Sequence, residues 1–279
     1  MTKRFYFYAM KNSLFIFASL LILSTSCKNN NDQNSKFSSK NIVKETPAHV
    51  KNLMENVAKN PDSTGLRLRL IDALDSLNNY KDALSQMDIL IRKDSGNFGL
   101  WYRKGKLLEN AKDTTNAITT FKIALNIYPS PDGILSLANL LAETKNQNAI
   151  TLCKQVLDLR MGREYNANAY FIIGVYYART NQFQKAEQSF NACINNNFAH
   201  MEAYLEKGFI YYDAKQFTDA LKIFKMAASI NNTYADAYYW MAKTQEALNQ
   251  KDDALKNYQT ALLLDKNLQE ARDAVNRLQ

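Results

Sequence analysis

Residues 98–131 read FGLWYRKGKLLENAKDTTNAITTFKIALNIYPSP, and this stretch decides the fold. Its centre is Ala117, which is followed four residues later by Phe121 and seven residues later by another alanine. Gly105 stands twelve residues before Ala117, and Trp101 stands four residues before the glycine. Apolar residues at intervals of three and four indicate one face of a helix. The stretch therefore combines small and aromatic residues at helical spacing.

The same spacing recurs along most of the chain, with a period close to 34 residues. Successive copies of the alanine are 34, 32, 37, 34 and 34 residues apart: Ala83, Ala117, Ala149, Ala186, Ala220 and Ala254. The positions four residues further on hold Met87, Phe121, Cys153, Phe190, Phe224 and Tyr258. A fixed period of this length is the signature of a repeat protein, in which each unit buries its apolar face against its neighbours.

This pattern resembles the tetratricopeptide repeat family, whose motif is W-x2-L-G-x2-Y followed by A-x3-F, A and P. The resemblance covers residues 64–268 and implies an all-α, right-handed α-solenoid of about six helix-turn-helix repeats. The copies run approximately over 64–97, 98–131, 132–166, 167–200, 201–234 and 235–268. Residues 47–63 are expected to form a leading helix, and residues 269–279 a C-terminal capping helix.

The third copy departs most from the motif, because it lacks the tryptophan and the glycine. We expect a shortened first helix there, and a lengthened loop over Arg160–Asn166. A kink or offset in the stack is expected at the same place.

The N-terminal residues have the layout of a secretory signal peptide. Lys3, Arg4 and Lys11 precede an apolar run, Ser13–Leu23, which is followed by small residues. The alternative is a permanent membrane helix. Eleven residues in a helix span only about 16 Å, roughly half of the hydrocarbon core of a bilayer, so a signal peptide over residues 1–26 is favoured.

Cys27 ends the motif STSC, which resembles the lipobox of bacterial lipoproteins. In that family the peptidase cuts before the cysteine, whose sulfur carries a diacylglycerol. Here Ser24 stands where leucine is usual, with Leu23 one place earlier. The resemblance implies lipidation at Cys27 and, with Lys28 next, sorting to the outer membrane of a diderm (Gram-negative) bacterium. Residues 27–46, which are polar and lack periodicity, are expected to be a flexible tether.

Three classes of function find no support in the sequence. The formal charge is +8, but the basic residues are scattered among acids, which disfavours a nucleic-acid partner. The two histidines, His49 and His200, have no partner at metal-ligand spacing. Glycine-rich phosphate loops and nucleophile motifs are absent. We therefore predict no enzymatic activity, no cofactor, no metal and no small-molecule substrate.

Cys153 and Cys193 occupy core positions of adjacent repeats, where cysteine behaves as a small hydrophobe. A disulfide between them is the alternative for an exported protein. Helix axes about 8–10 Å apart strain the distance that a disulfide allows.

In peptide-binding members of the family, fixed positions of each repeat face a concave groove. Transfer of that register gives a candidate groove of aromatic, apolar and charged residues: Tyr102, Lys106, Phe171, Val175, Arg179, Leu205, Phe209, Tyr212, Tyr239 and Lys243. Such a surface suits an extended peptide or a partner helix. For Phe209 and Tyr212, packing between repeats is the alternative.

The predicted function is a protein-binding scaffold, anchored through lipid at the outer membrane on its periplasmic side. Exposure on the cell surface stays open as a second location. A soluble exported chaperone of the holdase type is the alternative if Cys27 is not lipidated, and an enzyme is the least favoured alternative.

Overall fold

The computed structural model describes residues 47–279, and all regular elements within that range are α-helices. The predicted signal peptide, Cys27 and the predicted tether lie outside the described residues. The helices are α1 (Ala48–Lys59), α2 (Thr64–Ser76), α3 (Tyr80–Lys93), α4 (Phe98–Asn110), α5 (Thr114–Ile127), α6 (Pro131–Glu143), α7 (Asn148–Asp158), α8 (Arg163–Arg179), α9 (Phe183–Asn196), α10 (Met201–Asp213), α11 (Phe217–Ile230), α12 (Ala235–Ala247), α13 (Lys251–Leu264) and α14 (Gln269–Leu278). None of these helices is long and apolar enough to span a membrane.

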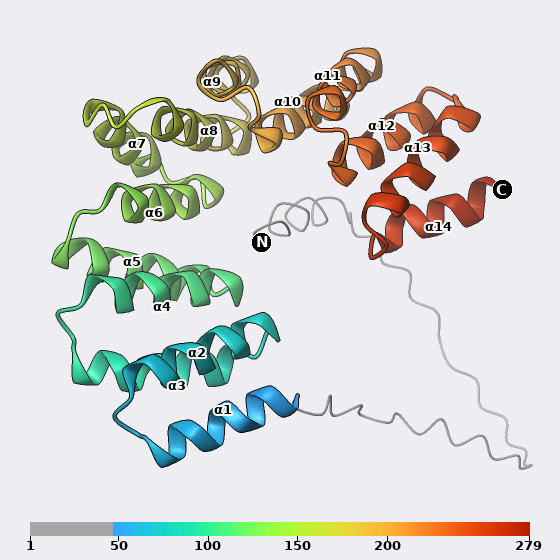
Figure 1. Cartoon of the computed structure of the whole chain (residues 1–279). Helices are drawn as coiled ribbons and strands as arrows, with labels where there is room; N and C mark the ends of the chain where they lie inside the picture. Colours follow the sequence, from blue (N-terminus) through green and yellow to red (C-terminus); the bar gives the residue numbers. More distant parts are fainter. Residues whose placement is uncertain (1–46) are drawn as a thin grey trace, which may run out of the picture. The chain divides into compact units, whose positions relative to one another are not determined.

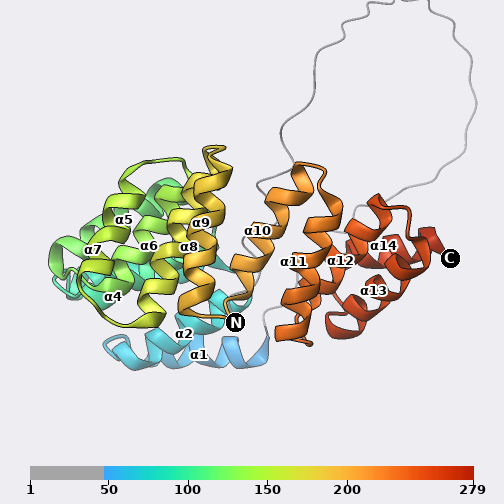
Figure 2. The same ribbon diagram turned by 90° about the horizontal axis from the view of Figure 1, so that it is seen from above.

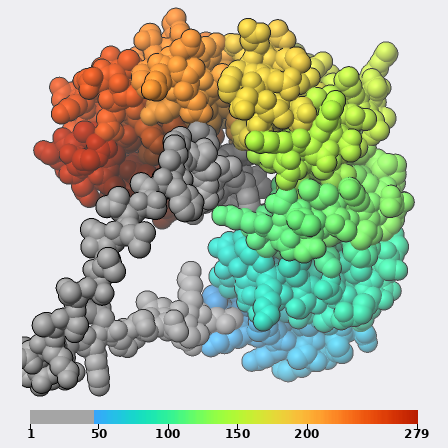
Figure 3. Space-filling view, turned by 180° about the vertical axis from the view of Figure 1, so that it is seen from behind, coloured from blue at the N-terminus to red at the C-terminus, as the bar shows by residue number. Residues whose placement is uncertain are grey.

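Each helix packs against the next one in chain order, from α1 on α2 to α13 on α14. Figures 1 and 2 show the helices as a row of hairpin-like pairs, and Figure 3 shows them as one band of packed atoms. In addition, α6 packs directly on α8, so the first helices of two neighbouring pairs are in contact. The all-α helical repeat fold predicted from the sequence is confirmed.

The helices of each pair are joined by the same turn. In each pair, the second residue after the first helix adopts a left-handed backbone conformation with φ between 59° and 61°. These residues are Asn78, Lys112, Lys145, Asn181, Lys215 and Asn249. The next N–H donates to a carbonyl five residues earlier, as from Asn79 to Leu74 and from Asp113 to Leu108, both at 2.9 Å. This six-to-one hydrogen bond is the Schellman motif, which ends a helix and reverses the chain.

A glycine and a phenylalanine bring the two helices of three pairs close together. The three phenylalanine side chains have no exposed surface. A Cβ atom on the glycine would lie only 2.3–2.6 Å from the ring of its partner: Gly105 with Phe121, Gly174 with Phe190, and Gly208 with Phe224. The spacing of glycine and phenylalanine in the sequence is therefore a packing requirement, because a larger residue would push the ring away.

The third pair differs from the sequence expectation in two ways. Its first helix, α6, has 13 residues, as many as α4, so it is not shortened. Residues 163–166 do not belong to a lengthened loop, because they form the first turn of α8, which extends to 17 residues. Gly162, with φ of 103°, precedes α8 in a backbone conformation that glycine adopts readily. The extra length of this copy therefore lies in a helix.

Cys153 on α7 and Cys193 on α9 are free thiols with no exposed surface. Burial raises the pKa of each thiol to about 12. Both cysteines thus act as small apolar core residues at positions that other apolar or aromatic side chains fill in the other copies.

The contact between glycine and phenylalanine predicts that Gly208→Ala strongly destabilises the fold. The added methyl group would clash with Phe224, so we expect a loss of about 1–3 kcal/mol in the free energy of unfolding. The matched control is Gly65→Ala, because a Cβ at exposed Gly65 on α2 meets nothing within 4 Å. There we expect a gain of up to about 1 kcal/mol from helix propensity. Urea unfolding followed by circular dichroism measures both, and equal stabilities would contradict the prediction.

Candidate functional site

The candidate groove residues lie on the first helices of the repeats: α4, α8, α10 and α12. We call the surface formed by α2, α4, α6, α8, α10, α12 and α14 the first-helix face. Contrary to the prediction, three of the groove residues are buried within it: Val175 has no exposed surface, and Phe171 and Leu205 are each 5% exposed. Their side chains pack between helices instead of facing a partner.

The close approach of α8 to its neighbours explains this burial. Phe171 packs on Phe190 of α9, with ring centroids 5.9 Å apart, and on His200, with centroids 4.7 Å apart. Helix α6 also packs directly on α8.

Arg179, another predicted groove residue, joins three neighbouring first helices. Its guanidinium donates to both carboxylate oxygens of Glu143 on α6, at 2.8 and 3.0 Å, and to both of Glu206 on α10, at 2.9 and 3.0 Å. The partners lie 36 and 27 residues away in the sequence. Such two-pronged bonds between guanidinium and carboxylate are among the strongest hydrogen bonds in proteins.

The electrostatics of this cluster are those of a buried site. Glu206 is 5% exposed, and loss of solvent raises its pKa although Arg179 opposes the shift. Burial acts to lower the pKa of Arg179, but the two carboxylates together raise it, so the guanidinium stays charged. Glu206 was not among the predicted groove residues, because its contact with Arg179 has no counterpart in the repeat pattern.

Tyr102 and Lys106 on α4 are half-buried and engaged locally. The Tyr102 hydroxyl lies 3.3 Å from the hydroxyl of Ser136 on α6, and its ring stacks on Phe98. Lys106 pairs with Glu109 at 2.5 Å. The structure does not bring these two residues into one pocket with the aromatic groove residues of α10 and α12.

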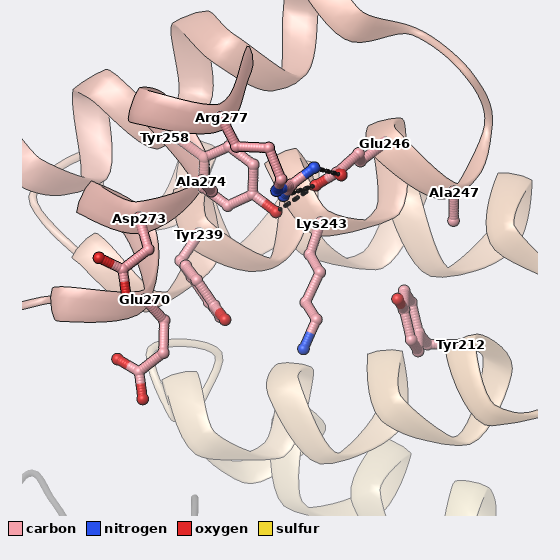
Figure 4. Close-up of a pocket in the computed structure, with 10 residues that line it drawn as sticks. All are labelled: Tyr212, Tyr239, Lys243, Glu246, Ala247, Tyr258, Glu270, Asp273, Ala274 and Arg277. Atoms are coloured by element: carbon pink, nitrogen blue, oxygen red, sulfur yellow. Dashed lines mark hydrogen bonds and ion pairs between the residues drawn. The ribbon is translucent and has the colours of Figure 1, made fainter. Parts of the chain in front are cut away.

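A pocket of about 540 Å³ opens at the C-terminal end of the first-helix face, and we call it the C-terminal pocket (Figure 4). Tyr212, Tyr239 and Lys243 line it, so the structure brings three of the predicted groove residues together. The complete lining comprises Tyr212, Tyr239, Lys243, Glu246, Ala247, Tyr258, Glu270, Asp273, Ala274 and Arg277. Its volume is in the range of ligand-binding clefts.

Aromatic rings form the wall between α10 and α12. Trp240 is buried and contacts Phe209, Tyr212 and Tyr239, with centroid distances of 4.5, 5.5 and 5.6 Å. Phe209, the remaining predicted groove residue, thus packs on the core. Tyr212 contacts the core through Trp240 and also lines the pocket. The ammonium of Lys243 lies 4.7 Å from the Trp240 ring centroid and 5.8 Å from that of Tyr239.

Glu246 organises the side of the pocket next to α14. Its carboxylate accepts hydrogen bonds from the two terminal guanidinium nitrogens of Arg277 and, at 3.0 Å, from the hydroxyl of Tyr258 (Figure 4). The hydrogen bond from Arg277 is the largest cause that lowers the pKa of Glu246. Burial and the neighbouring Glu246 raise the pKa of Tyr258.

Helix α14 contributes charges that the groove prediction did not include. Glu270, Asp273 and Arg277 lie three and four residues apart on one side of the helix, while Ala271 and Ala274 pack on the last repeat. This spacing was a sequence signal for a shared face. The spacing alone does not indicate that this face borders the C-terminal pocket.

The C-terminal pocket combines three tyrosine rings with five charged side chains. Within residues 47–279, no group of three or more His, Cys, Asp or Glu side chains is arranged to hold a metal ion. Aromatic rings with a few charged groups around a solvent-open pocket are the features with which proteins recognise peptide side chains.

Comparisons with known proteins agree with this architecture. Family models described as "Tetratricopeptide repeat" match residues 68–132, 167–200 and 211–278, together more than half of the chain. No curated protein matches the chain in sequence.

Solved structures show the same fold at low sequence identity. A tetratricopeptide repeat protein from Parabacteroides merdae matches with a TM-score of 0.67 and 14% identity, over 82% of this chain and 90% of that one. PilW, a type IV pilus biogenesis factor, matches with a TM-score of 0.60 and 19% identity, over 75% and 97%. A thermophilic TPR protein of Thermus thermophilus matches with a TM-score of 0.54 and 18% identity, over 65% and 98%.

The Arg179 cluster predicts that Arg179→Met destabilises the fold by an amount that depends on pH. The change leaves Glu206 buried without a countercharge, so we expect a loss of about 3–5 kcal/mol in the free energy of unfolding at pH 7. A buried carboxyl whose pKa is raised above its unfolded value stabilises the fold below the unfolded pKa and loses this contribution as pH rises. The defect should therefore be smaller at pH 4.5 than at pH 7.

Two controls accompany this measurement. Arg277→Met removes another pairing of arginine and glutamate, in which Arg277 is exposed, and should change the free energy of unfolding by less than about 1 kcal/mol. Adding Glu206→Leu to Arg179→Met should restore part of the loss. A defect of Arg179→Met that is independent of pH would contradict the assigned role of Glu206.

Proposed function

Since the chain belongs to the tetratricopeptide repeat family, we propose that it is a non-enzymatic adaptor that binds a protein partner on its first-helix face. The fold is typical of protein–protein interaction modules. The observation that carries the proposal is the C-terminal pocket, where Tyr212, Tyr239 and Lys243 converge from two neighbouring repeats. Tyrosine is among the side chains that most often anchor protein interfaces.

A peptide or a partner helix is the proposed occupant. The C-terminal pocket would take one anchoring side chain. The exposed rim of the face would contact the rest of the segment. Because Phe171, Val175 and Leu205 are buried, the middle of the face contributes shape and charge in place of apolar anchors.

We further propose that Cys27 carries lipid and holds the protein at the outer membrane, facing the periplasm. The support is the sequence of residues 1–27, with its basic start, apolar run and STSC motif. More than one acyl chain gives stable anchoring where a single chain gives marginal binding. The tether of residues 27–46 would let the repeats stand away from the membrane, with an average reach of about 25 Å.

The groove proposal predicts that Tyr212→Leu with Tyr239→Leu loses the partner. Leucine keeps apolar volume but removes the rings and hydroxyls, so recovery of the partner in a crosslinking pull-down from native membranes should fall about tenfold. Phe198→Ala is the control, because this ring is 71% exposed and does not line the pocket. Undiminished recovery by a double variant with normal helical content would refute the assignment of this pocket.

The anchoring proposal predicts that Cys27→Ser abolishes labelling with palmitate and releases the protein from the membrane fraction. The matched control, Cys153→Ala, removes a buried thiol and should keep the label. Globomycin should cause the precursor to accumulate. A wild-type protein without label and without precursor accumulation would favour the soluble exported chaperone instead.

A further inference from the structure

The C-terminal pocket has a charge distribution that selects its occupant. We propose that it receives a lysine or arginine side chain, so that the protein prefers a positively charged segment of its partner. This inference rests on the proposed protein-binding function and specifies the class of partner.

Carboxylates surround the pocket in excess of basic groups. Glu270 and Asp273 on α14 are exposed at its edge, on the opposite side of Tyr239 from Lys243 (Figure 4). Arg277 is already bound to Glu246, so this pair adds little net charge. Apart from the pair of Arg277 and Glu246, the charged side chains that line the pocket are Lys243, Glu270 and Asp273. Two carboxylates therefore stand against one ammonium group.

Two more carboxylates, Asp236 on α12 and Asp213 on α10, interact electrostatically with residues that line the pocket. Asp236 and Glu270 are among the groups that raise the pKa of Tyr239 to about 12, after the larger effect of burial. Asp213 on α10 interacts electrostatically with both Arg179 and Lys243. The surroundings of Tyr239 are therefore negative, although Lys243 lies beside it.

The aromatic wall suits a cation as well. The ammonium of Lys243 already lies over the rings of Tyr239 and Trp240, which shows that ring faces at this end accept a positive charge. A partner cation would enter on the side of Glu270 and Asp273 and lay its aliphatic stem along Tyr239. Arginine and lysine combine such a stem with a charged end.

The contrast with the whole chain makes this site selective. The formal charge of the chain is +8, and without Lys3, Arg4 and Lys11 of the proposed signal peptide it is 8 − 3 = +5. A basic partner therefore gains nothing from long-range attraction to the protein as a whole. Salt limits electrostatic interactions to about 8 Å under physiological conditions. The carboxylates at the pocket therefore attract a cation only once the partner is in contact. An acidic segment would be repelled by Glu270 and Asp273.

The test uses three fluorescein-labelled twelve-residue peptides and the full chain purified in detergent. All share one frame of Gly, Ser and Leu, and two central positions hold arginine, citrulline or glutamate. Citrulline keeps the shape of arginine without its charge. Fluorescence anisotropy gives the dissociation constants at 50 and 300 mM NaCl.

The arginine peptide should bind about fivefold or more tightly than the citrulline peptide at low salt, and this preference should shrink at high salt. Glu270→Gln with Asp273→Asn should abolish the preference. The matched control, Glu55→Gln with Asp158→Asn, makes the same change in charge at exposed sites on α1 and α7 and should retain it.

Equal binding of the three peptides, tighter binding of the glutamate peptide, or no binding of any would overturn the inference. The proposed function has a separate readout in the tyrosine double variant. If that variant loses the native partner while arginine is not preferred, protein binding stands and the charge preference falls. If the variant keeps the partner, the pocket itself is not the binding site.

Discussion

The rest of the structure depends on the contact between a glycine of one helix and a phenylalanine of the next. At Gly208 the ring of Phe224 occupies the space that any side chain would need. This contact fixes how closely two helices approach, and the Schellman turn before the second helix fixes its direction. The turn recurs in all six pairs and the contact between glycine and phenylalanine in three of them, at the same spacing. The pairs therefore present similar faces to their neighbours and stack as a row.

Stacking brings together residues that are far apart in the sequence. Arg179, Glu143 and Glu206 come from three different repeats, yet they form one hydrogen-bonded cluster because α6, α8 and α10 lie side by side. Burial makes this cluster sensitive to the loss of any member, since an unpaired buried charge is strongly unfavourable. The same stacking buries Phe171 and Val175. The residues in the middle of the first-helix face consequently serve to pack the helices together. The candidate binding surface therefore lies at the C-terminal end of this face.

The last helix gives that end its chemistry. Helix α14 covers the final repeat with Ala271 and Ala274 and turns its charged side toward α12. Its side chains combine with the tyrosines of α10 and α12 to make a mixed aromatic and charged pocket. A helix that stabilises the end of a repeat array thus also supplies part of the candidate site, which links the stability of the C-terminus to recognition.

The sequence by itself determined the fold class and the register of the repeats, because spacing of small and aromatic residues is a local property of each helix. The register of the family also assigned Tyr212, Tyr239 and Lys243 to one groove, and these three residues do line one pocket. The packing of the helices shows three further facts: Phe171, Val175 and Leu205 are buried, Arg179 binds two carboxylates, and Glu270 and Asp273 border the pocket. These facts depend on the distances between helices and on the rotation of α14 against α12, which a periodic pattern of residues does not encode.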